Sequence, residues 1–225
     1  MCHQSCIDFV RRVLTKEDIE GKKIIEVGSL DVNGSVRPYI ETFKPRQYIG
    51  VDIAIGPGVD EICDAKDIAE RYGRESFDVV ITTELLEHVK DWRKVINNLK
   101  DIVIPNGIIL ITTRSKGFGY HGFPSDYWRF EKDDMKYIFS DFVIKQLEKD
   151  PLASGIFVKA KKPQYFSKVE LSNYVLYSII ARRKTIRINE SFHVMFEVAV
   201  KIIRKILPSP IKSIIAKYLY VRKDN

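Results

Sequence analysis

The sequence predicts an α/β fold in which a mostly parallel sheet carries helices on both faces. Strand-like apolar runs alternate with helical patterns over residues 20–160, an order typical of strand–helix–strand units. Those runs are almost continuously apolar, as expected for strands buried on both faces of a sheet. At 225 residues the chain can also bury one sizeable core.

The expected elements follow in chain order. Ile7, Val10 and Leu14 lie at helical spacing and predict a short amphipathic helix over residues 5–14. Strands are expected at residues 23–27, 47–53, 59–62, 77–82, 107–112, 142–148 and 155–160. Further helices are expected at residues 35–43, 66–72, 91–100 (with Asp91 as N-cap) and 131–139.

Charge divides the chain near residue 162. Residues 1–160 carry 23 Lys and Arg against 26 Asp and Glu, whereas residues 161–225 carry 14 against 4. Apolar residues recur at three- and four-residue steps from Phe192 onward, which predicts helices there. We therefore expect a globular domain over residues 1–162 and a basic helical extension over residues 163–225.

Three functions of the extension remain open. Its helices could pack on the core or on a second subunit as a homodimer. A basic amphipathic helix could instead lie on a membrane surface as a peripheral contact. Basic charge also suits RNA, but no recognition motif of an RNA-binding module is visible. With no signal-peptide pattern and no apolar run of about 18 residues, we expect a cytoplasmic protein, with membrane association as the alternative.

The cysteines predict neither disulfides nor a metal centre. Three cysteines make no even disulfide framework, which suits a reducing compartment. Cys2, His3 and Cys6 are one ligand short of a structural zinc site, and no second ligand pair follows at zinc-site spacing. We therefore expect no metal.

A ligand site is expected where the first two strands end. The first strand finishes in Glu26-Val27-Gly28, and Gly28 has no side chain to keep a ligand from the backbone. In doubly wound sheets the ligand crevice lies at the carboxyl ends of the strands. Asp52 ends the second strand, where a carboxylate can accept hydrogen bonds from both hydroxyls of a ribose.

In this order and spacing, the motifs resemble those of class I S-adenosylmethionine-dependent methyltransferases. Glu26-Val27-Gly28 is similar to their first motif, and Asp52 to their ribose-binding acid. Asp64-Ala65 resembles their adenine-contacting pair, and residues 77–89 their fourth-strand motif. The resemblance covers roughly residues 20–160 and implies a Rossmann-like, seven-stranded sheet that binds S-adenosylmethionine. The chain departs from the family in its first turn, where Ser29-Leu30-Asp31 replaces a glycine-richer sequence.

The resemblance also assigns roles to single residues. Glu26 and Gly28 would hold the amino-acid end of the cofactor, and Asp52 its ribose. Ile53, Asp64 and Ala65 would contact the adenine. Thr83 would offer a backbone carbonyl near the methyl donor, while Glu84 and His88 would face the substrate.

The segment 119–130 is the expected substrate loop. It combines a histidine, an aspartate, an arginine and five aromatic rings after the fifth strand, and such side chains need partners. We expect Asp126, Trp128 and Arg129 to bind substrate, unless Trp128 packs on the sheet while Arg129 pairs with Asp126. A hydroxyl acceptor needs a base, for which His121 is favoured over His88 because His121 lies on this loop.

The predicted function is therefore S-adenosylmethionine-dependent O-methylation of a sugar or small-molecule hydroxyl. The acceptor would be a small molecule or a glycan. The alternatives are an RNA methyltransferase and a catalytically silent binding protein that retains the fold. Against the first, residues 83–86 lack the Asn/Asp-Pro-Pro-Tyr/Phe motif of many amino-directed nucleic-acid enzymes.

Overall fold

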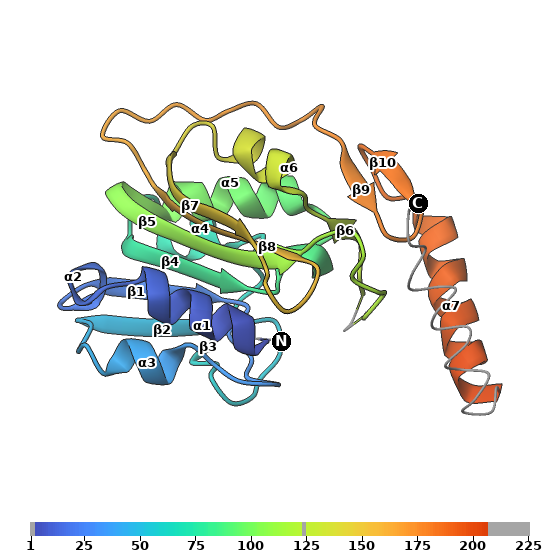
Figure 1. The fold of residues 1–225 in the computed structure, drawn as a ribbon, viewed down its shortest axis with the longest axis horizontal. Helices are drawn as coiled ribbons and strands as arrows, with labels where there is room; N and C mark the ends of the chain where they lie inside the picture. Colours follow the sequence, from blue (N-terminus) through green and yellow to red (C-terminus); the bar gives the residue numbers. More distant parts are fainter. Residues whose placement is uncertain (1–2, 123–124, 207–225) are drawn as a thin grey trace.

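A seven-stranded sheet forms the centre of the protein in a computed structural model that describes residues 3–122 and 125–206. Its strand order is β3-β2-β1-β4-β5-β8-β7 (Figure 1). The first five of these strands pair in parallel, whereas β8 runs antiparallel to β5 and to β7. The predicted fold class is confirmed. The strands are β1 (Lys23–Val27), β2 (Gln47–Asp52), β3 (Glu61–Ile62), β4 (Phe77–Thr83), β5 (Val103–Arg114), β7 (Val143–Lys149) and β8 (Gly155–Lys161).

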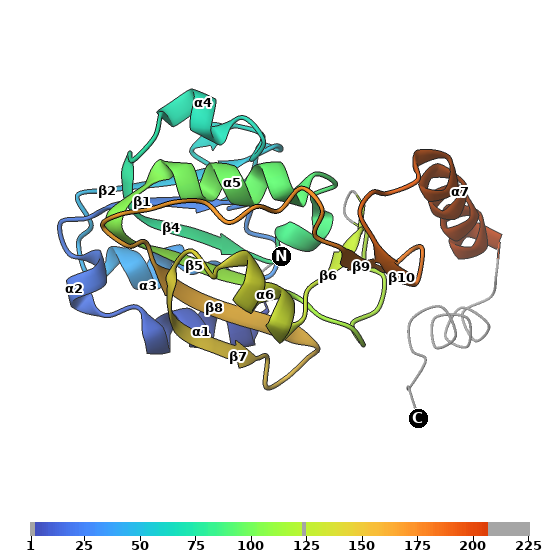
Figure 2. The same ribbon diagram turned by 90° about the horizontal axis from the view of Figure 1, so that it is seen from above.

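Helices cover both faces of this sheet (Figure 2). One face packs on α1 (Gln4–Val13), α2 (Lys16–Ile19) and α3 (Arg37–Glu41). The other packs on α4 (Ile68–Tyr72), α5 (Trp92–Ile102) and α6 (Lys132–Ile138). In β1, Ile24 belongs to the first apolar layer and Ile25 to the second, because successive strand side chains point to opposite faces.

Helix α5 shows how local sequence sets these elements. Val95, Ile96 and Leu99 lie on one face of the helix and are fully buried, which is the periodicity of an amphipathic helix. Asp91 is the N-cap, and its carboxylate accepts a hydrogen bond from the Lys94 amide at 3.3 Å. The predicted N-cap is thus confirmed, and this helix places its first turn beside the end of β4.

The first part of the basic extension is not helical, contrary to the prediction. Residues 163–175 run along the domain without a helix, and β9 (Leu176–Ser178) and β10 (Arg183–Thr185) then form a hairpin. β9 pairs antiparallel with β6 (Trp128–Arg129), which makes a second, three-stranded sheet. The partner of β9 is distant in the sequence, so periodicity within the extension could not reveal this pairing.

Helix α7 (Glu190–Ile206) ends the described part of the chain and stands to one side of the main sheet (Figures 1 and 2). Val200 packs with Tyr120 and Ile180 in a small apolar cluster. Another helix expected after Pro210 lies outside the described residues. Among the residues that the structure describes, no helix combines the length and the apolar character needed to cross a membrane.

Candidate cofactor and acceptor site

A cavity of about 510 Å³ opens at the carboxyl ends of β1, β2 and β4, within the size range of small-molecule sites. Sheet topology explains its position, because the parallel strands of this half all end at the same edge. The cavity is lined by Val27, Gly28, Leu30, Val32, Asp52, Ile53, Ala54, Cys63, Asp64, Ala65, Lys66, Glu84, Leu85, His88, Val89, Lys90, Asp91 and Tyr127.

The turn after β1 brings the backbone to the cavity surface. Gly28 has φ of 82°, a left-handed conformation that glycine adopts without strain. A Cβ atom added there would lie 3.1 Å from the Leu85 side chain. Asp52 holds the turn, since its carboxylate accepts hydrogen bonds from the amides of Leu30 (3.2 Å) and Ala54 (3.1 Å).

The predicted adenine-side residues also meet in this cavity. Ile53 follows β2 with its side chain exposed, and Ala65 is buried and also lines the cavity. Asp64 accepts a hydrogen bond from the Lys66 amide and forms an ion pair with the Lys66 ammonium group. Six of the predicted cofactor residues thus lie together: Gly28, Asp52, Ile53, Asp64, Ala65 and Glu84.

Two predicted cofactor residues do not line the cavity. Thr83 is buried at the end of β4. Glu26 is buried on β1, where its carboxylate accepts a hydrogen bond from the Tyr48 hydroxyl. Burial raises the pKa of Glu26 to about 7, although Tyr48 and the charge of Arg37 act in the opposite direction.

Glu84 occupies the turn at the end of β4 in an unusual backbone conformation. Its φ of 55° lies in the left-handed region, which costs a non-glycine residue energy and is common at functional sites. The carboxylate forms a buried ion pair with Arg114, and Arg114 also contacts Asp150 at 3.2 Å. Glu84 therefore lines the cavity while its carboxylate is held in place by Arg114.

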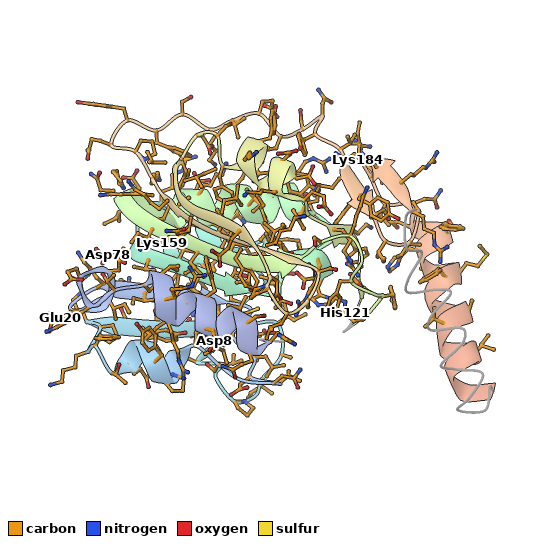
Figure 3. All side chains as sticks on the ribbon, viewed as in Figure 1. Asp8, Glu20, Asp78, His121, Lys159 and Lys184 are labelled. Atoms are coloured by element: carbon orange, nitrogen blue, oxygen red, sulfur yellow. The ribbon has the colours of Figure 1, made fainter. Side chains whose placement is uncertain are left out.

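Next to Glu84, three side chains form what we call the Glu87–His88–His121 cluster. One ligand-capable atom from each of the three lies within 4.8 Å of the others. Glu87 and His88 come from the short helix η1 (Leu86–His88), and His121 comes from the loop after β5, where Figure 3 labels it. The two imidazole rings have centroids 4.7 Å apart. Of the two predicted catalytic histidines, His88 lines the cavity and His121 lies behind it.

Electrostatics couples the members of this cluster. Burial alone would raise the pKa of Glu87, but the contacts with His121 and His88 outweigh it and lower that pKa to about 2. Burial likewise acts to lower the pKa of His121, yet Asp126 and Glu87 raise it to about 9. Burial lowers the pKa of His88. The carboxylate of Glu87 is therefore ionised among nitrogen donors.

The predicted substrate-binding side chains lie in the interior. Asp126 and Arg129 are fully buried and paired with each other, and Trp128 is 1% exposed. The Trp128 indole donates a hydrogen bond to the Lys90 carbonyl at 3.1 Å. Asp126 also accepts a hydrogen bond from the His121 amide and contacts His121 Nδ1 at 2.9 Å. These three residues stabilise the loop and hold His121, and none of them lines the cavity.

Other site residues were not predicted. Tyr127 reaches the cavity, and its backbone donates a hydrogen bond to the Glu87 carbonyl at 2.8 Å. Glu87 was visible in the sequence only as part of the fourth-strand motif. One signal could have identified it, namely a second acid three residues after Glu84 and directly before His88.

Most of the chain matches one known protein family. A family model described as a methyltransferase domain matches residues 2–175 of the chain. No curated protein matches the sequence.

Several solved structures share the fold. An S-adenosylmethionine-dependent methyltransferase from Mesorhizobium loti is 14% identical, with a TM-score of 0.56 over 69% of this chain and 96% of that protein. The 1,6-didemethyltoxoflavin-N1-methyltransferase of Burkholderia thailandensis, solved with bound 1,6-didemethyltoxoflavin and S-adenosylhomocysteine, is 14% identical, with a TM-score of 0.58 over 70% of this chain and 78% of that protein. Magnesium protoporphyrin IX methyltransferase from Synechocystis, solved with S-adenosylhomocysteine, is 16% identical, with a TM-score of 0.55 over 71% and 83%. At these identities the likeness concerns the fold.

Proposed function

Because the chain belongs to the class I S-adenosylmethionine-dependent methyltransferase family, we propose that it methylates a hydroxyl oxygen of a small molecule or sugar, with S-adenosylmethionine in the cavity at the ends of β1, β2 and β4. The observation that carries this proposal is the convergence of Gly28, Asp52 and Asp64 on one cavity. These residues come from three consecutive strand ends, and each offers the group that one part of the cofactor requires.

The cofactor would lie along the strand ends. Asp52 would accept hydrogen bonds from the ribose hydroxyls, each worth about 1.5–3 kcal/mol for a charged acceptor. Ile53 and Ala65 would enclose the adenine, and Asp64 would accept a hydrogen bond from its amino group. The open backbone at Gly28 would admit the amino-acid end, next to the buried carboxylate of Glu26.

The acceptor would approach from the side of the Glu87–His88–His121 cluster. Methyl transfer forms a bond from the acceptor oxygen to the methyl carbon while the bond from that carbon to the sulfonium sulfur breaks, leaving a thioether. Its main demand is a collinear arrangement of the three reacting atoms. An alcohol must also lose its proton, and the cluster is the polar group adjacent to the cavity that could promote this loss.

Calorimetric titration with S-adenosylmethionine tests the proposal. We expect micromolar binding by the native protein and at least tenfold weaker binding by Asp52→Ala, because the ribose loses its acceptor. Asp8→Ala is the matched control, since Asp8 lies exposed on α1 away from the cavity (Figure 3), and it should bind as the native protein does. Transfer of labelled methyl groups to panels of sugars, phenols and amines then identifies the acceptor class. Failure of the folded native protein to bind S-adenosylmethionine would refute the proposal.

A further inference from the structure

One oxygen of the buried Glu87 carboxylate has no hydrogen-bond partner among the described residues. The side chain is 0% exposed. Oε2 accepts a hydrogen bond from the Thr113 hydroxyl at 2.8 Å, whereas Oε1 accepts none. An ionised carboxylate in the interior is costly unless it is paired or coordinates a metal. Glu87 Oε1 is therefore a buried acceptor with room for one further partner, either a hydrogen-bond donor or a metal ion.

Two imidazole nitrogens face this oxygen. His121 Nε2 lies 3.7 Å and His88 Nε2 lies 4.0 Å from Glu87 Oε1. Both separations exceed hydrogen-bond length. All three ligand atoms thus surround one small volume without contacting one another directly.

The Nδ1 atom of each ring already has a hydrogen-bond partner, which fixes the ring so that Nε2 is the nitrogen available to a metal ion. His88 Nδ1 lies 2.6 Å from the Ser125 carbonyl, and since a carbonyl only accepts, that nitrogen carries the proton. His121 Nδ1 lies 2.9 Å from the Asp126 carboxylate and is likewise a donor. A cation that binds here displaces the remaining ring proton of His121, and Nε2 of each ring then presents a lone pair on the side of Glu87. Histidines that bind metals show the same outer contacts, to a backbone carbonyl or a carboxylate.

The negative charge of Asp126 is already balanced by Arg129. Its two oxygens accept hydrogen bonds from Arg129 at 2.5 and 2.6 Å, so its charge is balanced by the guanidinium. The pair remains fully buried. One carboxylate and two imidazoles are left facing each other, which is a ligand set for a divalent transition metal.

We propose that Glu87 Oε1, His88 Nε2 and His121 Nε2 bind one divalent transition-metal ion. Bonds to zinc-like ions measure about 2.0–2.2 Å, so the ligand atoms must move inward by about 1 Å or less, which small side-chain rotations permit. The histidine side chains are 10% and 20% exposed, whereas Glu87 is closed to solvent. A further ligand of the bound ion would therefore approach on the side of the two histidines. This side is connected to the cavity, because His88 lines it.

This site would explain how the acceptor is activated, and that role rests on the proposed function. A hydroxyl oxygen bound to the ion would lose its proton to solvent more readily, because a divalent cation stabilises the alkoxide. The alkoxide would then attack the methyl carbon. The ion acts as a Lewis acid, and no electron transfer is involved.

Direct metal titration tests the site without requiring activity. Untagged protein is treated with chelator, exchanged into buffer and titrated with Co²⁺, followed by calorimetry and by the visible absorption of bound cobalt. We expect one equivalent, and at least about tenfold weaker binding in Glu87→Gln and in His121→Ala. Glu87→Gln preserves side-chain size, so its folding should remain intact, which thermal melting verifies. His3→Ala is the matched histidine control and should leave the affinity unchanged.

The outcomes separate this proposal from the function that precedes it. Absence of cobalt uptake, or uptake that neither substitution weakens, overturns the metal site even where S-adenosylmethionine binds. Stoichiometric uptake lost in both variants supports the site, including the case in which S-adenosylmethionine does not bind and the proposed function fails. If the native protein binds both cobalt and S-adenosylmethionine, removal of the metal by a chelator should abolish methyl transfer while leaving the affinity for S-adenosylmethionine unchanged.

Discussion

The Arg129 guanidinium donates one hydrogen bond to each carboxylate oxygen of Asp126, three residues earlier in the chain, and neither side chain is exposed. The same carboxylate contacts His121. Because the guanidinium also donates hydrogen bonds to the carbonyls of Phe118 and Gly119, one arginine links residues 118–119 to Asp126 in the loop after β5. This arrangement makes Arg129 a structural element of the loop that carries His121.

Replacing Arg129 by alanine should destabilise the protein by about 3–5 kcal/mol, because Asp126 would remain as a buried charge without its partner. Denaturant unfolding measures the loss. Arg71→Ala is the control, since Arg71 forms an ion pair with Glu61 on the surface with its side chain 56% exposed, and such pairs contribute less than about 1 kcal/mol. Equal losses in the two variants would contradict the structural role of Arg129.

Gly28→Ala should weaken S-adenosylmethionine binding at least tenfold. The new Cβ would crowd Leu85 at 3.1 Å in the wall of the cavity, and the left-handed backbone adds about 1–2 kcal/mol of strain. Gly73→Ala separates the two effects, because Gly73 has φ of 79° and its added Cβ would meet only Ser76 Oγ, at 3.6 Å. Calorimetry on both variants should show a loss of affinity in the first alone.

Glu26 should make stability fall as the pH rises from about 4.5 to about 7. Its folded pKa is raised to about 7 by burial, so over this window the unfolded chain releases the proton while the native protein keeps it. The stabilisation is complete below the unfolded pKa and lost above the folded one. Glu26→Gln, which can still accept a hydrogen bond from Tyr48, should be more stable than the native protein at pH 8 and similar to it at pH 4. Unfolding free energies at the two pH values provide the measurement.

The same carboxylate should govern the pH dependence of cofactor affinity. An ammonium group of the cofactor favours ionised Glu26, so affinity should decrease as the pH falls below about 7, by up to tenfold per unit. Glu26→Gln should bind more weakly at pH 7.5 and show a flat profile between pH 5.5 and 7.5. A native profile that is equally flat would show that Glu26 does not contact the ammonium group.

Helix α7 should restrain the loop that carries His121. The Phe196 ring packs edge-on against Tyr120 at 5.3 Å between centroids, a contact worth about 0.5–1.5 kcal/mol. Phe196→Ala should therefore speed amide hydrogen exchange over residues 115–122 several-fold. Phe192→Ala lies on the same helix with its ring 44% exposed, and exchange in this variant should match the native rate.

The convergence of Gly28, Asp52 and Asp64 on one cavity was predictable from sequence because the information for it is local. Gly28, Asp52 and Asp64 each follow a recognisable apolar strand, and parallel strands bring their carboxyl ends to one edge. The acceptor side depends on contacts between distant segments. Nothing local to His121 indicates that its ring meets Glu87, and composition alone does not tell whether Arg129 faces a ligand or is buried against Asp126. The β9–β6 pairing was missed for the same reason.

The three-stranded sheet has a consequence for the order in which the protein forms during synthesis. Every strand of the main sheet precedes residue 162, so the sheet can begin to form while the rest of the chain is still in the ribosome, and Leu171 and Leu176 join its apolar core later. The Tyr127 carbonyl, however, accepts a hydrogen bond from the Ile179 amide, and the His193 ring stacks on Tyr127. The contacts of Tyr127 are therefore completed only when these late residues have emerged, and under the proposed function a nascent chain able to hold the cofactor would not yet have its full acceptor site.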